Sequence, residues 1–331
     1  MINEPDRQTI TRWDKNRNGQ QSLRLRKREH KAAEELDAFC REFSSLAPSV
    51  HITPFEEEKP FSGHRGLPGL VLKDNLIYSA IPLERELPPF LEGLDTICSR
   101  TPVPPPDIRE VLEQIPAPCD LVLYIARQCP HCPGVVQTLL PLAVFSDKVR
   151  LTVIDGSLFP EAAQKDRVMS APCLLLGEEF RWTGAVPALE IINMMVRQDP
   201  AKLGMESLRG IIEEGNAQWI TDQMVKAHTI FPSFVKLLLH DAWSVRLGAM
   251  VIVESLGENH PGLAKKICPL LMDAFSGKDI PVQGDILYAL GQAGGRNEKE
   301  WIASRLNALD HPDLKEAAED ALEDIDSRIG Q

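Results

Sequence analysis

The chain has 331 residues, of which 43% are hydrophobic and 25% are charged, so it can build several buried cores. Its formal net charge of −12 argues against nonspecific binding to nucleic acid or to an acidic membrane. Seven irregularly spaced cysteines do not form the framework of a small secreted protein, and the first residues contain no apolar signal core. We therefore expect a cytoplasmic protein of several domains, with no nucleic acid and no membrane among its partners.

The first third of the chain opens with a polar segment. Residues 1–31 carry nine Lys or Arg against four Asp or Glu. The start has few apolar residues to bury, so residues 1–20 are predicted to be a flexible basic tail. Apolar residues at helical spacing predict an amphipathic helix over 27–46, and the proline-rich stretch 101–107 predicts a linker.

A Cys-x-x-Cys motif, Cys129-Pro130-His131-Cys132, lies between an apolar extended run and an apolar helical run. The first cysteine therefore lies at a helix N-terminus, where the helix dipole and the free N–H groups favour a thiolate. The second cysteine is one turn away and can close a disulfide. The spacing suits thiol–disulfide exchange, with Cys129 as the nucleophile and Cys132 as the resolving thiol. We expect His131 to stabilise the thiolate by a hydrogen bond and a positive charge.

The pattern around the motif predicts a small α/β unit. A strand at 121–126 precedes the motif helix, and a strand at 149–155 and a short helix near 160–168 follow it. Strands at 171–176 and 179–182 and a final helix complete the order β-α-β-α-β-β-α. The first two strands are expected to be parallel, and the last two to form a hairpin.

An internal repeat links this unit to the preceding one. Residues 67–72 read Leu-Pro-Gly-Leu-Val-Leu, and 104 positions later residues 171–176 read Ala-Pro-Cys-Leu-Leu-Leu. Each segment continues into a second strand and a helix, and the same offset aligns Glu86 with Glu190. The dithiol position of the first unit falls near 25–28, where there is no cysteine. Only the second unit can perform this redox chemistry.

The last third reads as helix after helix with short turns. Three similar segments begin at Val245, Val282 and Leu314, at spacings of 37 and 32 residues. Paired helices of this period stack into a solenoid, because one pair cannot bury its apolar stripes alone. Residues 206–331 therefore resemble an all-α HEAT-like helical repeat domain, which would bind a protein partner. A compact helical bundle is the alternative.

Residues 21–200 resemble the N-terminal domain of the flavoprotein subunit of alkyl hydroperoxide reductase and the related, glutaredoxin-like protein disulfide oxidoreductases. Motifs in matching order carry the resemblance: Cys129-x-x-Cys132-Pro-x-Val-Val-Gln137, Ile154-Asp-Gly156, Asp166-Arg-Val-Met169, Ala171-Pro172 and Pro82-Leu-x-x-Glu-Leu87. The resemblance implies two α/β thioredoxin-like folds in tandem. The first, at 21–105, lacks the dithiol, and the second, at 106–205, holds it.

The resemblance also implies roles for residues outside the tetrapeptide. It implies a cis bond before Pro172 and before Pro68. Pro172 would face the dithiol and shape the strand edge on which a substrate segment pairs. Glu86 would lie near the dithiol and assist proton transfer, whereas an ordinary helix-surface glutamate is the alternative. The predicted site thus comprises Cys129, Pro130, His131, Cys132, Pro172 and Glu86.

The sequence predicts an enzyme, a thiol–disulfide oxidoreductase whose redox group is its own dithiol, with no cofactor and no metal. The resemblance implies a disulfide in a partner such as a peroxiredoxin. No Gly-x-Gly-x-x-Gly is present, so a thioredoxin-reductase-like protein is the expected electron donor. The Pro130-His131 pair matches disulfide-forming oxidases, which leaves the direction of electron flow open.

Two other functions stay open at this point. The chain could act as a redox-sensing HEAT-repeat scaffold without steady turnover. It could also be a metal-binding adaptor, in which the dithiol binds zinc together with Cys119, His131 or Cys173.

Overall fold

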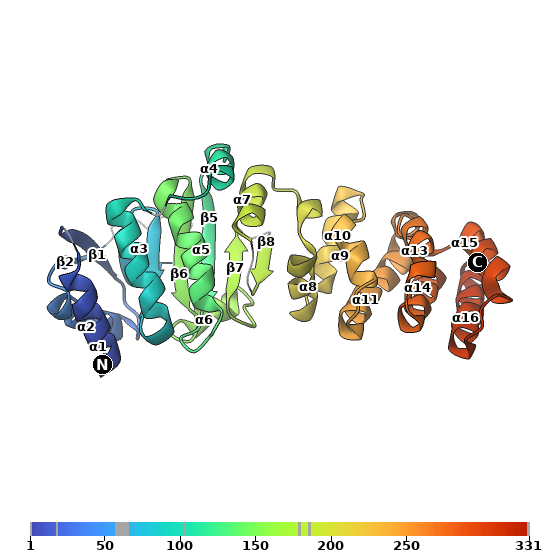
Figure 1. The fold of residues 1–331 in the computed structure, drawn as a ribbon, viewed down its shortest axis with the longest axis horizontal. Coiled ribbons are helices and arrows are strands. Elements are labelled where there is room, and N and C mark those ends of the chain that lie inside the picture. The colour runs from blue at the N-terminus through green and yellow to red at the C-terminus, as the bar shows by residue number, and fades with distance from the viewer. Residues whose placement is uncertain are drawn as a thin grey trace. The chain divides into compact units, whose positions relative to one another are not determined.

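The structure is a computed structural model that describes residues 2–17, 19–56, 66–101, 103–177, 180–184 and 187–329. The chain divides into two compact units, Met1–Gln198 and Asp199–Gln331. The first unit is α/β and the second is all-helical (Figure 1). The short helix η2 (Pro200–Lys202) packs against helices of the second unit, close to the composition boundary that the sequence shows near Asp199 and Pro200.

One eight-stranded sheet runs through the first unit, in the order β2-β1-β3-β4-β6-β5-β7-β8. In each half a central strand is parallel to one neighbour and antiparallel to the other, and a hairpin follows. The two halves therefore share one topology. The strands are β1 (Gln21–Lys27), β2 (Val50–Glu56), β3 (Gly69–Lys73), β4 (Leu76–Ser79), β5 (Cys119–Ile125), β6 (Val149–Asp155), β7 (Cys173–Leu176) and β8 (Phe180–Thr183).

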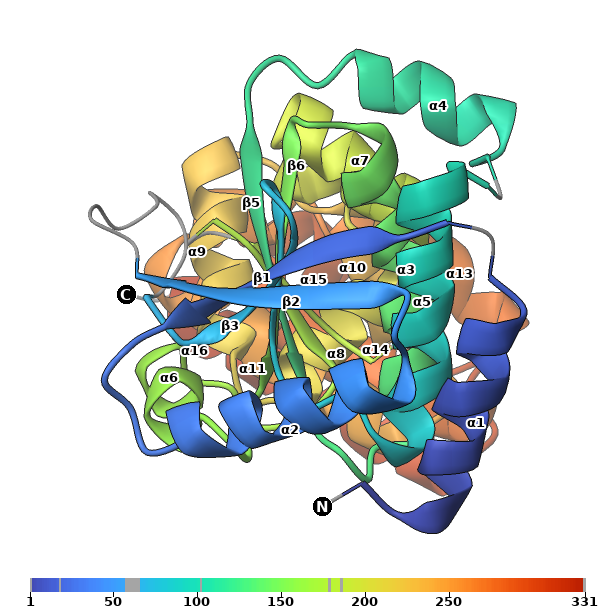
Figure 2. The same ribbon diagram turned by 90° about the vertical axis from the view of Figure 1, so that its left-hand side faces the viewer.

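The two halves join where β4 pairs with β6. These strands are parallel, in a register that runs from Leu76↔Leu151 to Ser79↔Ile154. The Asn75 side chain secures the start of the joint, because its amide donates to the carbonyls of Ala143 and Val149, each at 2.7 Å. Figure 2 shows this twisted sheet from the β2 end.

Helices cover the sheet and bring the two halves together a second time. Helices α3 and α5 pack side by side. A Cβ atom added at Gly93 of α3 would lie 2.4 Å from Leu140 Cδ1 of α5, so glycine permits this close approach. The helices are α1 (Glu4–Lys15), α2 (Ala33–Leu46), η1 (Glu84–Glu86), α3 (Leu87–Ser99), α4 (Pro106–Glu113), α5 (Cys132–Phe145), α6 (Pro160–Lys165) and α7 (Ala188–Arg197).

The internal repeat extends to side-chain contacts. The Tyr78 hydroxyl lies 3.4 Å from a carboxylate oxygen of Glu86, and the Trp182 indole N–H donates to Glu190 at 3.1 Å. Both members of the second pair lie 104 residues after those of the first. The sequence repeat thus reflects two copies of one β-hairpin and helix.

The prediction of a flexible tail over residues 1–20 is wrong, because helix α1 occupies residues 4–15. Asn3 caps this helix by accepting a hydrogen bond from the Asp6 backbone at 2.8 Å, and Ile10 is fully buried. The Trp13 indole donates to Asp95 of α3 at 2.9 Å. Composition could not reveal this docking, because its partners lie far along the chain.

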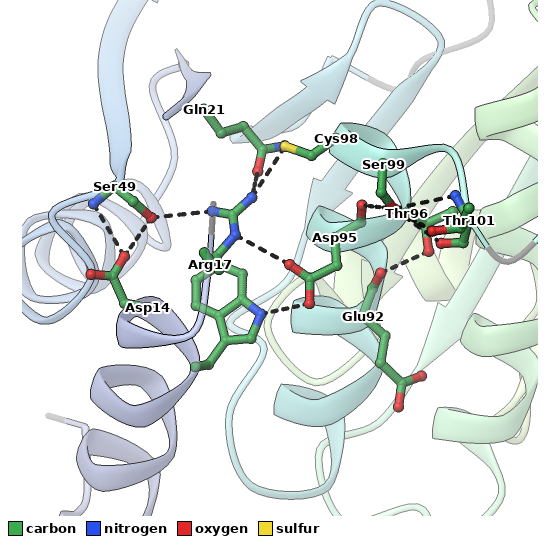
Figure 3. A network of polar contacts seen from close by, with 11 residues as sticks. Asp14, Arg17, Gln21, Ser49, Glu92, Asp95, Thr96, Cys98, Ser99 and Thr101 are labelled. Carbon is green, nitrogen blue, oxygen red and sulfur yellow. Dashed lines mark hydrogen bonds and ion pairs between the residues drawn. The ribbon is translucent and has the colours of Figure 1, made fainter. Parts of the chain in front are cut away.

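Arg17 secures the end of this segment, as Figure 3 shows. Its guanidinium donates to Gln21 at 2.8 Å and to Ser49 at 3.3 Å, and it pairs with Asp95 at 3.1 Å. It also stacks over Trp13, 4.3 Å from the ring centroid. A basic residue that composition assigned to a solvated tail therefore joins three segments of the first half.

Three further predictions need correction. The helix predicted over 27–46 begins only at Ala33, since Lys27 still belongs to β1 and a turn lies between the strand and the helix. The predicted linker at 101–107 ends in helix α4, whose first residue is Pro106, a position that tolerates proline. Ala171-Pro172 is the cis bond of the described chain, so the cis bond implied at Leu67-Pro68 is not formed.

The second unit is helical throughout its described part. Helices α11, α14 and α16 pack next to one another in chain order, and each contains one of the three similar sequence segments. The HEAT-like assignment stays a prediction. The helices are α8 (Met205–Glu213), α9 (Ala217–Ala227), α10 (Pro232–Leu238), α11 (Trp243–Asn259), α12 (Pro261–Ala264), α13 (Cys268–Ala274), η3 (Phe275–Gly277), α14 (Ile280–Ala293), α15 (Arg296–Leu306) and α16 (Pro312–Ile329). Across the described ranges, no helix is both long and apolar enough to cross a membrane.

Candidate active site

The tetrapeptide lies where β5 gives way to α5. The strand ends at Ile125, and a turn follows in which the Cys129 N–H donates to the Ala126 carbonyl at 2.9 Å. Cys132 is the first residue of α5, and Pro133 occupies the second position, where its missing N–H costs no helical bond. The sequence therefore places Cys129 just before the N-terminus of a helix, as predicted.

The two cysteines differ in exposure and in contacts. Cys129 is half-buried, and its Sγ accepts a hydrogen bond from the Cys132 backbone N–H at 3.2 Å. Cys132 is completely buried. Burial raises the pKa of Cys132 well above its usual value, and the hydrogen bond with Cys129 and the charge of Glu86 raise it further. An incoming disulfide can therefore reach Cys129 but not Cys132.

The peptide bond before Pro172 lies against the first cysteine. The Cys129 thiol donates to the Ala171 carbonyl at 3.3 Å, and the bond between Ala171 and Pro172 is cis. Pro172 itself is buried and leads directly into β7. The proline loop and the dithiol, 42 residues apart, thus meet at one place.

The two inner residues of the motif, Pro130 and His131, are exposed. His131 is the N-cap residue of α5, but its side chain makes no capping hydrogen bond. Its predicted effect on the Cys129 thiolate stays a prediction.

Glu86 comes from the first half and reaches the site through the joint between the halves. It ends η1, and only 2% of its surface is exposed. Burial raises the pKa of Glu86 to about 7, the hydrogen bond from Tyr78 opposes this rise, and the negative charge of Asp155 adds to it. Its Oε1 is buried without a hydrogen-bond partner. Glu86 is therefore a buried acid beside the dithiol and not a helix-surface residue.

Two other members of this cluster were not predicted as site residues. Tyr78 is fully buried, and burial raises its pKa well above the usual value, so its hydroxyl stays protonated beside Glu86. Asp155 is 3% exposed, and its carboxylate accepts the Ser157 N–H at 2.8 Å. Tyr78 is on β4 and Asp155 ends β6, the two strands that join the halves. The equivalence of Tyr78 to Trp182 in the repeat was the one sequence signal for it.

Glu86→Gln is expected to flatten the pH dependence of stability. The folded-state pKa of about 7 lies above the ordinary value of 4.5, so the folded chain binds more protons within this window. The contribution of Glu86 is therefore complete below pH 4.5 and is lost as the pH rises through 7. The free energy of unfolding lost over this pH range is at most about 3 kcal/mol. Urea unfolding at pH 5 and pH 8 measures this difference.

The half-buried Glu190 provides the matched control, because it holds the same place in the second copy of the repeat. The effect that belongs to Glu86 is the difference between the Glu86→Gln and Glu190→Gln variants, since each removes one carboxyl from the same place in its copy. If the two variants show the same pH dependence of stability, burial does not perturb the Glu86 carboxyl.

The first half holds a different residue at the dithiol position. Helix α2 begins at Ala33 as α5 begins at Cys132, so residues 30–33 are the counterpart of the motif. The predicted counterpart at 25–28 is wrong, because it falls mostly within β1. His30 takes the place of Cys129, its ring lies tilted against Phe159 with the centroids 4.8 Å apart, and it pairs with Glu161.

Within the described ranges, no cluster of three or more His, Cys, Asp or Glu side chains is arranged to hold a metal ion. Cys119 and Cys173, the cysteines considered as further zinc ligands, are both buried. The Cys119 Sγ contacts the Ala117 carbonyl at 3.3 Å.

Comparison with known proteins supports the thioredoxin fold. A family model for the thioredoxin domain matches residues 121–197. Among solved structures, the NTD_N/C domain of alkyl hydroperoxide reductase AhpF from Enterococcus faecalis superposes with a TM-score of 0.51 at 20% identity, covering 59% of this chain and all of that one. A protein disulfide oxidoreductase from Aeropyrum pernix gives 0.52 at 14% identity, covering 60% and 94%. These likenesses show the fold.

Curated relatives are similar over part of their length. The AhpF component of alkyl hydroperoxide reductase from Pseudomonas aeruginosa is 27% identical over 117 residues, which is 35% of this chain and 22% of that protein. An NADH dehydrogenase from Ferdinandcohnia aciditolerans is 25% identical over 167 residues, or 50% and 31%. The chain thus spans less than a third of these relatives.

The strand order, the cis-proline loop, the geometry of the dithiol and the family match all indicate a thioredoxin fold. Residues 121–197 match the thioredoxin domain and carry the Cys-x-x-Cys pair, and they form part of a tandem thioredoxin-like unit.

Proposed function

We propose that this protein exchanges disulfides with a partner protein through Cys129 and Cys132. One observation carries the proposal: a half-buried Cys129 Sγ receives a backbone N–H at the start of α5, above a fully buried Cys132. The N–H contact and the helix dipole favour negative charge on the first sulfur. Because Cys132 is buried, its sulfur reacts only after Cys129 has formed the mixed disulfide.

The exchange begins when the Cys129 thiolate attacks one sulfur of the partner's disulfide. A bond forms between Cys129 and that sulfur, and the partner's other sulfur leaves as a thiolate and takes up a proton. The carbonyl of Ala171, 3.3 Å from the Cys129 Sγ, lies at the edge where the partner's backbone would pair. The result is a mixed disulfide.

Resolution requires the buried Cys132 to lose its proton. In this proposal the Glu86 carboxylate receives it, since its charge acts on Cys132 and its pKa of about 7 suits a base near neutrality. The Cys132 thiolate then attacks Cys129, closes the internal disulfide and releases the second partner thiolate. Two electrons have moved from the dithiol to the partner. The reverse sequence oxidises a partner dithiol.

The likeness to the AhpF component of alkyl hydroperoxide reductase favours a peroxiredoxin as the disulfide partner. A thioredoxin-reductase-like protein would restore the dithiol. In this scheme the second unit is a HEAT-like array that binds a protein partner, and the reaction takes place in the cytoplasm.

Turnover tests the proposal against a redox-sensing scaffold. The full chain is mixed with a hundredfold excess of insulin and with dithiothreitol, and the disulfides reduced per molecule are counted above the uncatalysed rate. An enzyme reduces many disulfides per molecule. A count that stops at one would identify a sensor and overturn the proposed enzyme.

A further inference from the structure

The second unit exposes large apolar side chains on two adjacent helices. On α11, Trp243, Leu247 and Val251 are 61%, 43% and 49% exposed. On α14, Ile280 and Tyr288 are 41% and 39% exposed. These five residues are called the apolar patch below. Contiguous apolar surface of this kind on a folded domain marks a binding site.

The five side chains share one face. Successive members of the α11 set are four residues apart, and those of α14 are eight apart, so each set follows one side of its helix. The Tyr288 hydroxyl donates to Glu254 at 2.7 Å, which joins the exposed sides of α11 and α14. Gly284, between Ile280 and Tyr288, would meet nothing within 4 Å if it carried a Cβ. The patch therefore has an open centre.

An acidic rim borders the patch on α16. Gln292, one turn after Tyr288, donates to Asp324 of α16 at 2.7 Å, so the patch side of α14 adjoins the Asp324 side of α16. Asp313, Glu316 and Asp320 lie on that same side of α16 and are exposed. Arg328, one turn after Asp324, is half-buried and donates to the carbonyls of Gly291 and Gln292, so its charge is turned toward α14.

We propose that the apolar patch and the acidic rim form a docking surface for a basic amphipathic helix of a partner protein. Apolar side chains at i and i+4 on the partner would cover Trp243 and Leu247, and Lys or Arg on its flank would face the rim. A second copy of this chain fits poorly, because it would bring another acidic rim to a chain of net charge −12. The surface stands independently of the dithiol.

The test uses the full-length chain and two labelled 16-residue helical peptides, one of Leu and Lys and its twin of Leu and Glu. Fluorescence anisotropy is expected to detect binding of the Lys peptide alone. Leu247→Asp should weaken it by about tenfold or more. This change adds a negative charge, so attraction by charge alone would instead strengthen binding.

Leu270→Asp is the matched control, because Leu270 on α13 is 48% exposed and lies outside the patch. It should bind the Lys peptide as the parent does, whereas Asp320→Lys should weaken binding by reversing a rim charge. Equal binding of both peptides, no binding, or an equal effect of Leu247→Asp and Leu270→Asp overturns the proposal. So does a parent dimer in sedimentation that Leu247→Asp dissociates, since the occupant is then a second copy.

Discussion

Cys129→Ser is expected to lower the rate of insulin disulfide reduction by at least ~10³-fold, to the uncatalysed rate. A serine hydroxyl is not ionised near neutrality and forms no mixed disulfide. Cys132 cannot replace the lost thiol, because it is fully buried and its pKa is raised. The initial rate with dithiothreitol as reductant measures the effect.

Cys98→Ser is the control for this change. Cys98 is an exposed thiol on α3, where it lies 3.1 Å from the Arg17 guanidinium (Figure 3). Its removal should leave the rate unchanged. A Cys129→Ser variant that keeps a tenth of the parent rate would assign the exchange to another thiol.

Cys132→Ser is expected to arrest the reaction halfway. Cys129 still attacks the incoming disulfide, but no internal thiol remains to release the partner. The mixed disulfide should then persist for hours, since uncatalysed exchange is slow. A shift in mass on a non-reducing gel, reversed by dithiothreitol, measures it, and mass spectrometry of the joined peptides identifies Cys129.

The double variant, with serine at both positions, separates this trap from adventitious oxidation. It should form no adduct under the same conditions. An adduct on Cys98 in the single variant would show that the exposed thiol on α3, and not the motif, had captured the partner.

The dithiol was predictable because its signals are local. An apolar strand, a Cys-x-x-Cys motif and a helix start follow one another within 121–140, and no distant contact is needed to place them. The alternation of Leu23 and Leu25 with arginines is the same kind of signal for β1, although the helix predicted from residue 27 overlapped its end.

The environment of the site depends on contacts that the local sequence does not contain. Asp155 becomes a neighbour of Glu86 because β4 pairs with β6, a strand more than 70 residues further along the chain. The resemblance pointed to Glu86, but its burial and its pKa of about 7 follow from that pairing. The docking of α1 through Arg17 is likewise non-local, so composition alone misread that segment.

The joint between β4 and β6 also explains why the copy without a dithiol persists. Were that copy deleted, the edge of β6 that pairs with β4, from Leu151 to Ile154, would become an open ladder of backbone donors and acceptors, the kind of surface that recruits other chains into aggregates. The half without the dithiol therefore protects the strand edge of the half that holds it.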